Sequence, residues 1–142
     1  MSDAARRILL TILLLGMAGV SLELWLMAHT EDFYQLIPLG LAAAGTVTAV
    51  LVAMRPSIGS VRLFQAVMAL FLISGVIGAV LHFQVNIEFQ QEMDAALSGL
   101  ALYQKAILAK SPPALAPGAM IQLGLIGLAY TFRHPALTPG RN

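Results

Sequence analysis

Apolar residues form four runs along this chain of 142 residues, at about 8–28, 35–54, 63–83 and 114–132. Each run is close to the roughly 20 residues that an α-helix needs to cross the hydrocarbon core of a bilayer. The connections between the runs are short, except for the segment between the third and the fourth. The pattern predicts an all-α polytopic membrane protein, a bundle of four transmembrane helices in a single domain over residues 1–142.

The long connection between the third and fourth runs has a helical pattern of its own. Apolar positions recur at intervals of three and four over about residues 86–110, with charged residues on the other faces. This spacing predicts an amphipathic helix that Asn86 caps at its start. A second interpretation stays open, in which the third helix continues and Asn86 shares one face with His82.

The arginines determine the predicted orientation. All six flank the apolar runs on one side of the predicted bundle: Arg6, Arg7, Arg55, Arg62, Arg133 and Arg141. By the positive-inside rule, this side and both termini lie in the cytoplasm, most naturally at a cell inner membrane. The amphipathic segment and five of the seven acidic residues then lie on the outer face.

Composition excludes several classes of protein. The chain is 58% hydrophobic and 11% charged, with a mean hydropathy of +0.82, which is unlike an ordinary soluble domain. A net charge of +1 does not indicate a nucleic-acid partner, and the absence of cysteine excludes disulfides and thiolate sites. The sequence has no phosphate-binding loop or nucleophile elbow that would indicate an enzyme with soluble substrates. The expected partners are the lipid bilayer and other membrane subunits, or a second copy.

Small residues recur on single helix faces. Gly16 and Gly19 share a face of the first span, and Gly75 and Gly78 share a face of the third. Small faces allow helices to approach closely in lipid, so these spans are expected to pack tightly with each other or with a partner.

Glu23 is the most unusual residue in the four spans. It lies about 15 residues, or roughly 22 Å, into the first span, within the outer third of the hydrocarbon. A carboxylate there costs on the order of 2.5–3.5 kcal/mol on insertion scales, so it should face the bundle and find a partner or a proton. The candidate partners are His82, Gln122, Ser21 and Thr30. Asn86 and Gln122 are the other expected intramembrane polar contacts.

The histidines and carboxylates near the outer face suggest a cofactor site. His29 and His82 lie near the outer ends of two helices that run in the same direction, which is the minimum for bis-histidine haem ligation. Glu23, Glu88 or Glu92 could complete a transition-metal site. Capping or interfacial roles remain open for both histidines. Neighbouring aromatic residues fit either an interfacial belt or a pocket for a quinone or pigment.

The sequence therefore favours a non-catalytic integral membrane subunit. It would dock onto a larger inner-membrane assembly through its small-residue helix faces and the outer amphipathic helix. The alternative is a metal- or haem-binding membrane protein with a His/Glu site at the outer face, serving electron or proton transfer. A third interpretation, a proton pathway through Glu23, lacks ionisable partners in the inner half of the bundle.

Overall fold

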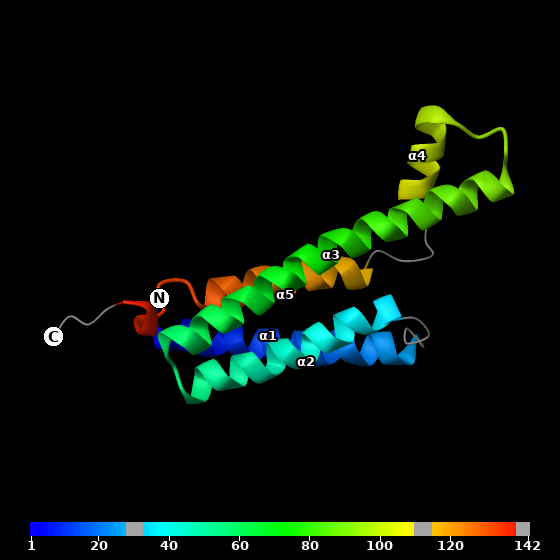
Figure 1. Cartoon of the computed structure of the whole chain (residues 1–142). Coiled ribbons are helices and arrows are strands. Elements are labelled where there is room, and N and C mark those ends of the chain that lie inside the picture. The colour runs from blue at the N-terminus through cyan, green and yellow to red at the C-terminus, as the bar shows by residue number, and fades with distance from the viewer. Residues whose placement is uncertain (28–32, 110–114, 139–142) are drawn as a thin grey trace.

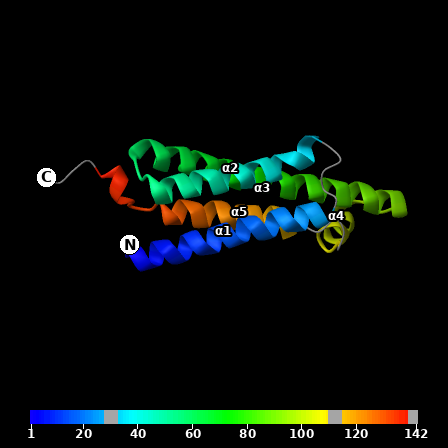
Figure 2. The same cartoon turned by 90° about the horizontal axis from the view of Figure 1, so that it is seen from below.

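The computed structural model of this chain describes residues 1–27, 33–109 and 115–138, and all regular structure in these residues is helical. The elements are α1 (Asp3–Leu26), α2 (Phe33–Met54), α3 (Ile58–Met93), α4 (Gly99–Ile107), α5 (Leu115–Tyr130) and the short 3-10 helix η1 (Pro135–Leu137). Four of them pack in a ring, in which α1 contacts α2, α2 contacts α3, α3 contacts α5 and α5 contacts α1. Figures 1 and 2 show these four helices side by side.

The start of α1, the α2–α3 connection and the end of α5 lie together at one end of the bundle (Figure 1). Because the described arginines belong to these segments, we call this the arginine end and the opposite one the far end. Serine side chains cap two helices here: Ser2 Oγ accepts from Ala5 N, and Ser57 and Ser60 form a reciprocal capping box. The segments that carry Arg6, Arg7, Arg55, Arg62 and Arg133 are grouped at one end as predicted, while Arg141 lies outside the described residues.

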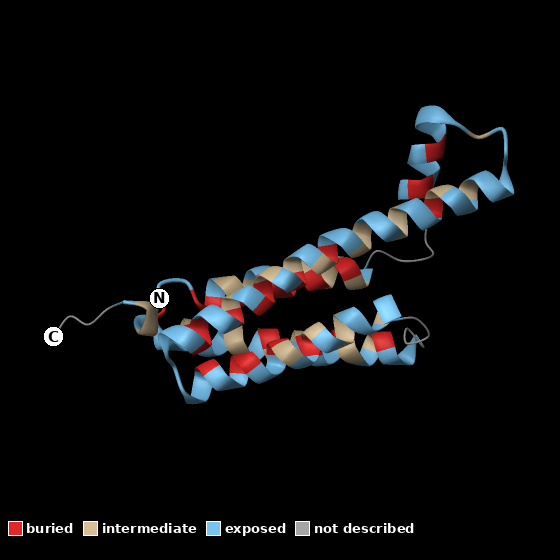
Figure 3. Ribbon diagram, in the orientation of Figure 1, coloured by how far each residue is buried: buried red, intermediate tan, exposed pale blue. Residues whose placement is uncertain are grey.

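Among the helices of the described residues, three are long and apolar enough to cross a membrane: α1, α2 and α3. Only 22–28% of their most apolar windows is buried inside the bundle, and large side chains such as Leu15 and Val47 are more than 60% exposed. Figure 3 shows that exposed residues extend along the outside of all three helices. An apolar exterior of this extent is suited to lipid rather than water. At 16 residues, or about 24 Å, α5 is shorter than the roughly 30 Å hydrocarbon core.

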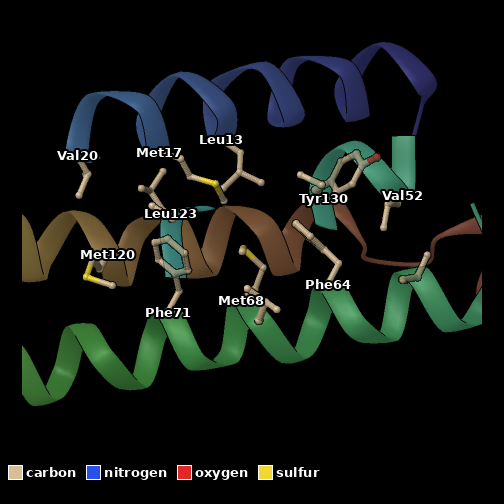
Figure 4. Close-up of a cluster of buried hydrophobic side chains, with 14 of the residues drawn as sticks. Leu13, Met17, Val20, Val52, Phe64, Met68, Phe71, Met120, Leu123 and Tyr130 are labelled. Carbon is tan, nitrogen blue, oxygen red and sulfur yellow. The ribbon is translucent and has the colours of Figure 1, made fainter. Parts of the chain in front are cut away.

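The core is a layer of large side chains around α5, which lies between α1 and α3 (Figure 4). Leu13 and Met17 of α1 point toward α5 from one side, and Phe64, Met68 and Phe71 of α3 do so from the other. All five side chains are at most 1% exposed, so this layer is buried as completely as the interior of a soluble protein.

Glycines allow α3 and α5 to approach backbone to backbone. A Cβ on Gly75 would lie 2.7 Å from the Pro117 carbonyl oxygen, and one on Gly124 would lie 2.9 Å from the Met68 carbonyl oxygen. Neither position has room for a side chain. The small-residue faces predicted for close packing are thus used inside this chain at these positions.

The prediction that a new helix starts at Asn86 is wrong, and the second interpretation, in which the third helix continues past Phe83, is confirmed. The helix runs unbroken for 36 residues, about 54 Å, because no proline or other strong breaker precedes Asp94. The amphipathic segment expected over 86–110 is consequently divided, with its first part continuing α3 and its second forming α4. Asn86 is not an N-cap but a buried residue inside α3.

The end of α2 near the far end also differs from expectation. The predicted span begins at residue 35, which places Pro38 in its first turn, whereas α2 begins at Phe33 and contains Pro38 in its interior. Pro38 has no N–H to donate to the carbonyl group of Tyr34, one turn earlier. Pro117, in contrast, lies in the first turn of α5, where its missing N–H leaves no helix hydrogen bond unmade.

Candidate functional site

A cavity of about 330 Å³ opens between α1, α2, α3 and α5 toward the far end. It exists because α5 is short: Gly127 packs beside Phe64, and the first turn of α5 reaches only as far as Gly78 on α3. Beyond that level α5 does not accompany α3, and the next described helix packed against α3 is α4. The cavity is lined by Glu23, Leu24, Met27, Tyr34, Gln35, Ile37, Pro38, Ser74, Ile77, Gly78, Leu81, His82, Ala116, Pro117 and Met120.

The cavity wall is apolar apart from a few side chains, which include Glu23 on α1 and His82 on α3. Both of these residues are half-buried. Although they line the same space, no ion pair joins them. Among the described residues, none donates a hydrogen bond to the Glu23 carboxylate. The space between α1 and α3 is therefore bordered by one carboxylate and one imidazole that do not pair with each other.

Several residues predicted to accompany Glu23 lie elsewhere. Gln122 is exposed on α5 and does not line the cavity, so it is not the partner of Glu23. Ser21 is half-buried on α1 but also lies outside the cavity lining. Thr30 and His29 fall outside the described residues. The polar contacts expected between Glu23 and its neighbours are thus not formed by the described candidates.

The expected metal site is not assembled in the part of the chain that the structure describes. Glu88 and Glu92 follow His82 by six and ten residues on α3, which places them about 9 and 15 Å farther along the helix. Both are exposed, and neither lines the cavity. Residues 1–27, 33–109 and 115–138 contain no group of three or more His, Asp or Glu side chains placed to hold a metal ion. His29, the other histidine of the predicted haem pair, lies outside the described residues.

Asn86 connects α3 to α4. It is 7% exposed, and its Nδ2 donates a 3.3 Å hydrogen bond to the carbonyl oxygen of Ala106, while its Oδ1 is buried without a partner. One turn earlier, the ring of Phe83 stacks on Tyr103 with centroids 6.2 Å apart. Asn86 does share α3 with His82, but its amide faces α4 rather than a cofactor site. We call residues 84–109, the end of α3 with α4 folded beside it, the arm; Figure 1 shows it projecting beyond the other helices.

The arginine end contains a second polar cluster, which the sequence analysis missed. Arg6 is 8% exposed, and its guanidinium donates to the carbonyl oxygens of Tyr130, Phe132 and Arg133 at 3.0, 3.3 and 2.8 Å. These carbonyl groups belong to the last residue of α5 and to the residues just after it, where no further N–H groups are available within the helix. A cation at this position also complements the negative end of the helix dipole. Arg6 therefore ties the start of α1 to the end of α5.

His134 completes this cluster. Its Nδ1 accepts a 3.2 Å hydrogen bond from Ala136 N, and its ring contacts Tyr130 edge to face. Burial lowers the pKa of His134, and the nearby Arg6 charge lowers the same pKa further. The lowered pKa favours the neutral imidazole, which the acceptor role of Nδ1 requires. No local sequence pattern indicates this arrangement, because Arg6 and His134 come near each other only on folding.

Comparison of the sequence with protein-family models and with curated proteins found no match, and comparison of the fold with solved structures found none. Two features of the molecule suggest a function, the arm and the cavity at the far end.

Proposed function

We propose that this chain is a non-catalytic membrane protein that spans the bilayer four times and docks onto a larger membrane assembly through its arm. The observation that carries the proposal is the length of α3. About 20 residues suffice to cross the hydrocarbon, whereas α3 has 36, and its last ten residues include Gln84, Glu88 and Glu92. These polar residues favour water, so the end of α3 and α4 would stand above the membrane surface.

The fourth crossing is supported by the arrangement of α5. This helix packs in the ring with α1, α2 and α3, and the arginine that follows it, Arg133, lies at the arginine end with Arg6. Because α3 leaves the arginine end and the arm lies beyond the far end, α5 would have to return through the bilayer. Its 16 residues would be accommodated by local thinning of the bilayer, or by Thr131 and Phe132 extending the crossing segment. The arginine end, with both termini, would face the cytoplasm.

The arm exposes more large apolar side chains than a water-facing surface usually does. Val85, Phe89 and Met93 recur every fourth residue along α3, and Leu100, Tyr103 and Ile107 recur every third or fourth residue along α4. Each is about half exposed or more, while α4 uses Leu102 and Ala106 to contact α3. A helical hairpin with apolar residues left on its outer faces is typical of a surface that another protein covers.

Charge favours a particular occupant. Glu88, Glu92 and Asp94 are exposed on the arm and Lys105 is its one described cation, so the partner is expected to present basic residues around an apolar patch. A second, parallel copy of this chain is a poorer fit because the described arginines are all at the opposite end. Anionic lipid is also a poorer fit, because the acidic side chains of the arm would repel its headgroups.

The small-residue faces contribute less to this proposal than the sequence suggested. Gly16 packs against Leu123 and Gly45 against Met17, so both are used within the chain. Gly19 has no neighbouring atoms where a side chain would begin, and it remains available on the outside of α1. The arm therefore carries the docking proposal.

The test is native mass spectrometry of the protein purified from its own membrane in a mild detergent. We expect one additional polypeptide at fixed stoichiometry with the wild-type chain, and its loss in Phe89→Asp. Gln91→Asp is the matched control, because it adds the same charge at an exposed position two residues away on the same helix. The partner would then be purified separately, and Phe89→Asp should weaken the reconstituted complex at least tenfold.

Two results would refute the proposal. One is a wild-type protein that purifies only as itself, as a monomer or a homo-oligomer. The other is a complex that Phe89→Asp and Gln91→Asp affect equally while both variants remain monodisperse, since the arm would then not be the contact.

A further inference from the structure

We propose that the cavity at the far end binds an amphiphilic cation, with an apolar body against α3 and α5 and a positively charged head at Glu23. This inference is independent of docking by the arm. It rests on the size of the cavity, the composition of its wall and the state of its carboxylate.

The size and wall of the cavity suit a small apolar molecule. Its volume of about 330 Å³ lies at the lower end of the roughly 300–1,000 Å³ that is usual for ligand pockets. Ile77, Leu81 and Met120 are among the side chains that form the wall, and they offer no polar group to a ligand body. A body the size of one ring or a short branched alkyl group would fit this space.

The position of Glu23 determines the charge of the ligand. Its carboxylate is half-buried on α1, one of the helices apolar enough to cross a membrane, and no described side chain donates a hydrogen bond to it. The described arginines are at the other end of the bundle, Lys105 lies on the arm, and His82 does not form an ion pair with Glu23. A bound cation would provide the partner that the described residues do not, which is how intramembrane carboxylates commonly function.

The rim adds selectivity for a large, weakly hydrated cation. Tyr34 lines the cavity and is 78% exposed, so its ring can swing over a cationic head as well as contact its apolar substituents. A quaternary or substituted ammonium is attracted to both a carboxylate and an aromatic face, whereas a small hydrated metal ion gains nothing from the apolar wall. The shared chemistry is an ammonium that carries an apolar group, whether free or as a lipid headgroup.

The experiment is a calorimetric titration of the full chain in uncharged maltoside micelles with benzyltrimethylammonium. Neopentylbenzene is its neutral counterpart of the same shape, in which carbon replaces nitrogen. We expect saturable binding of one cation per chain and at least tenfold weaker binding of the neutral molecule. Glu23→Gln should weaken cation binding at least tenfold, while Glu88→Gln, which removes an exposed carboxylate outside the cavity, should not change it. Competition by short-chain phosphatidylcholine would assign the lipid headgroup as the source, and no competition a free cation.

A second variant protects the test against a folding defect in Glu23→Gln. Ser74→Phe keeps the carboxylate and adds a ring to the cavity wall, so it should also abolish binding. The inference is overturned if wild type does not bind the cation, if both variants bind it normally, or if the neutral molecule binds equally well. Stoichiometric zinc binding that requires both Glu23 and His82 would also overturn it, because the pair would then be a metal site. None of these outcomes affects the docking test, which measures complex formation by variants of the arm.

Discussion

Replacing Arg6 by methionine should destabilise the helix bundle far more than replacing Arg7, although both changes remove one arginine next to the same span. Arg6 is buried and donates three hydrogen bonds to carbonyl oxygens near the end of α5, whereas Arg7 is exposed and its side chain has no such partner among the described residues. Methionine is unbranched and preserves most of the apolar contact of the arginine stem.

The magnitude follows from the three acceptors. A hydrogen bond to a charged group contributes about 1.5–3 kcal/mol, and a buried acceptor left without its donor costs about 1–3 kcal/mol. The Tyr130 carbonyl contact is buried, but those of Phe132 and Arg133 are only partly buried, so water can replace part of what is lost. We therefore expect Arg6→Met to lower the free energy of unfolding by about 2–4 kcal/mol. Arg6→Lys should lose roughly half as much, because an ammonium group cannot reach all three acceptors at once.

The assay is reversible unfolding in mixed detergent micelles, followed by energy transfer between fluorophores on two engineered cysteines. The chain has no native cysteine, so Ile12→Cys on α1 and Leu125→Cys on α5, both exposed, can be labelled specifically. Arg7→Met is the control and should change the free energy of unfolding by less than about 0.5 kcal/mol. Equal losses in Arg6→Met and Arg7→Met would refute the reasoning, since the effect would then come from charge near the membrane and not from the hydrogen bonds.

Three further results are expected. Gly75→Ala should cost about 1–3 kcal/mol in the same unfolding assay because its Cβ would meet the α5 backbone, while Gly19→Ala, which meets no atoms within 4 Å, should be neutral or slightly stabilising. Asn86→Ala should speed amide hydrogen exchange in α4 while α1 and α5 keep their protection, because it removes the hydrogen bond that fastens the arm. The pKa of His134 is lowered in the fold, so the unfolded chain binds the proton more readily. The contribution of His134 to the free energy of unfolding should therefore be fully present above the ordinary pKa of about 6.5 and decrease as the pH drops below it. Unfolding measured at pH 7.5 and 5.5 should show this loss in the wild type and a smaller one in His134→Asn.

The helices were predictable because their signal is local. An apolar run of about 20 residues is unstable in water and in an extended form in lipid, so it identifies a membrane helix without knowledge of its neighbours. The arginines that flank these runs likewise indicated which ends lie together. What the runs could not reveal is where a helix ends beyond the hydrocarbon: the polar residues after Phe83 form helix as readily as the apolar ones before it, and α3 therefore continues to Met93.

The candidate site was predictable only in part. Glu23 and His82 stand out as ionisable residues in apolar helices, and they do line one cavity. Their expected companions Glu88, Glu92 and Gln122 do not, because α3 carries the first two past the bundle and α5 turns the third outward. Asn86 was expected at a helix start or in a polar site, yet it fastens α4, since a continuous α3 brings it opposite Ala106.

The sequence alone determined that this is an all-helical chain with helices apolar and long enough to cross a membrane, and with its described arginines near one end, because these properties depend on composition and local periodicity. The tertiary structure alone decided three things: that α5 is too short to fill the far end, that Arg6 meets the end of α5, and that the arm stands free of the bundle. Each depends on the relative lengths and positions of helices distant in sequence, which no local pattern encodes. The cavity and the arm, on which the functional proposals rest, are products of these length differences.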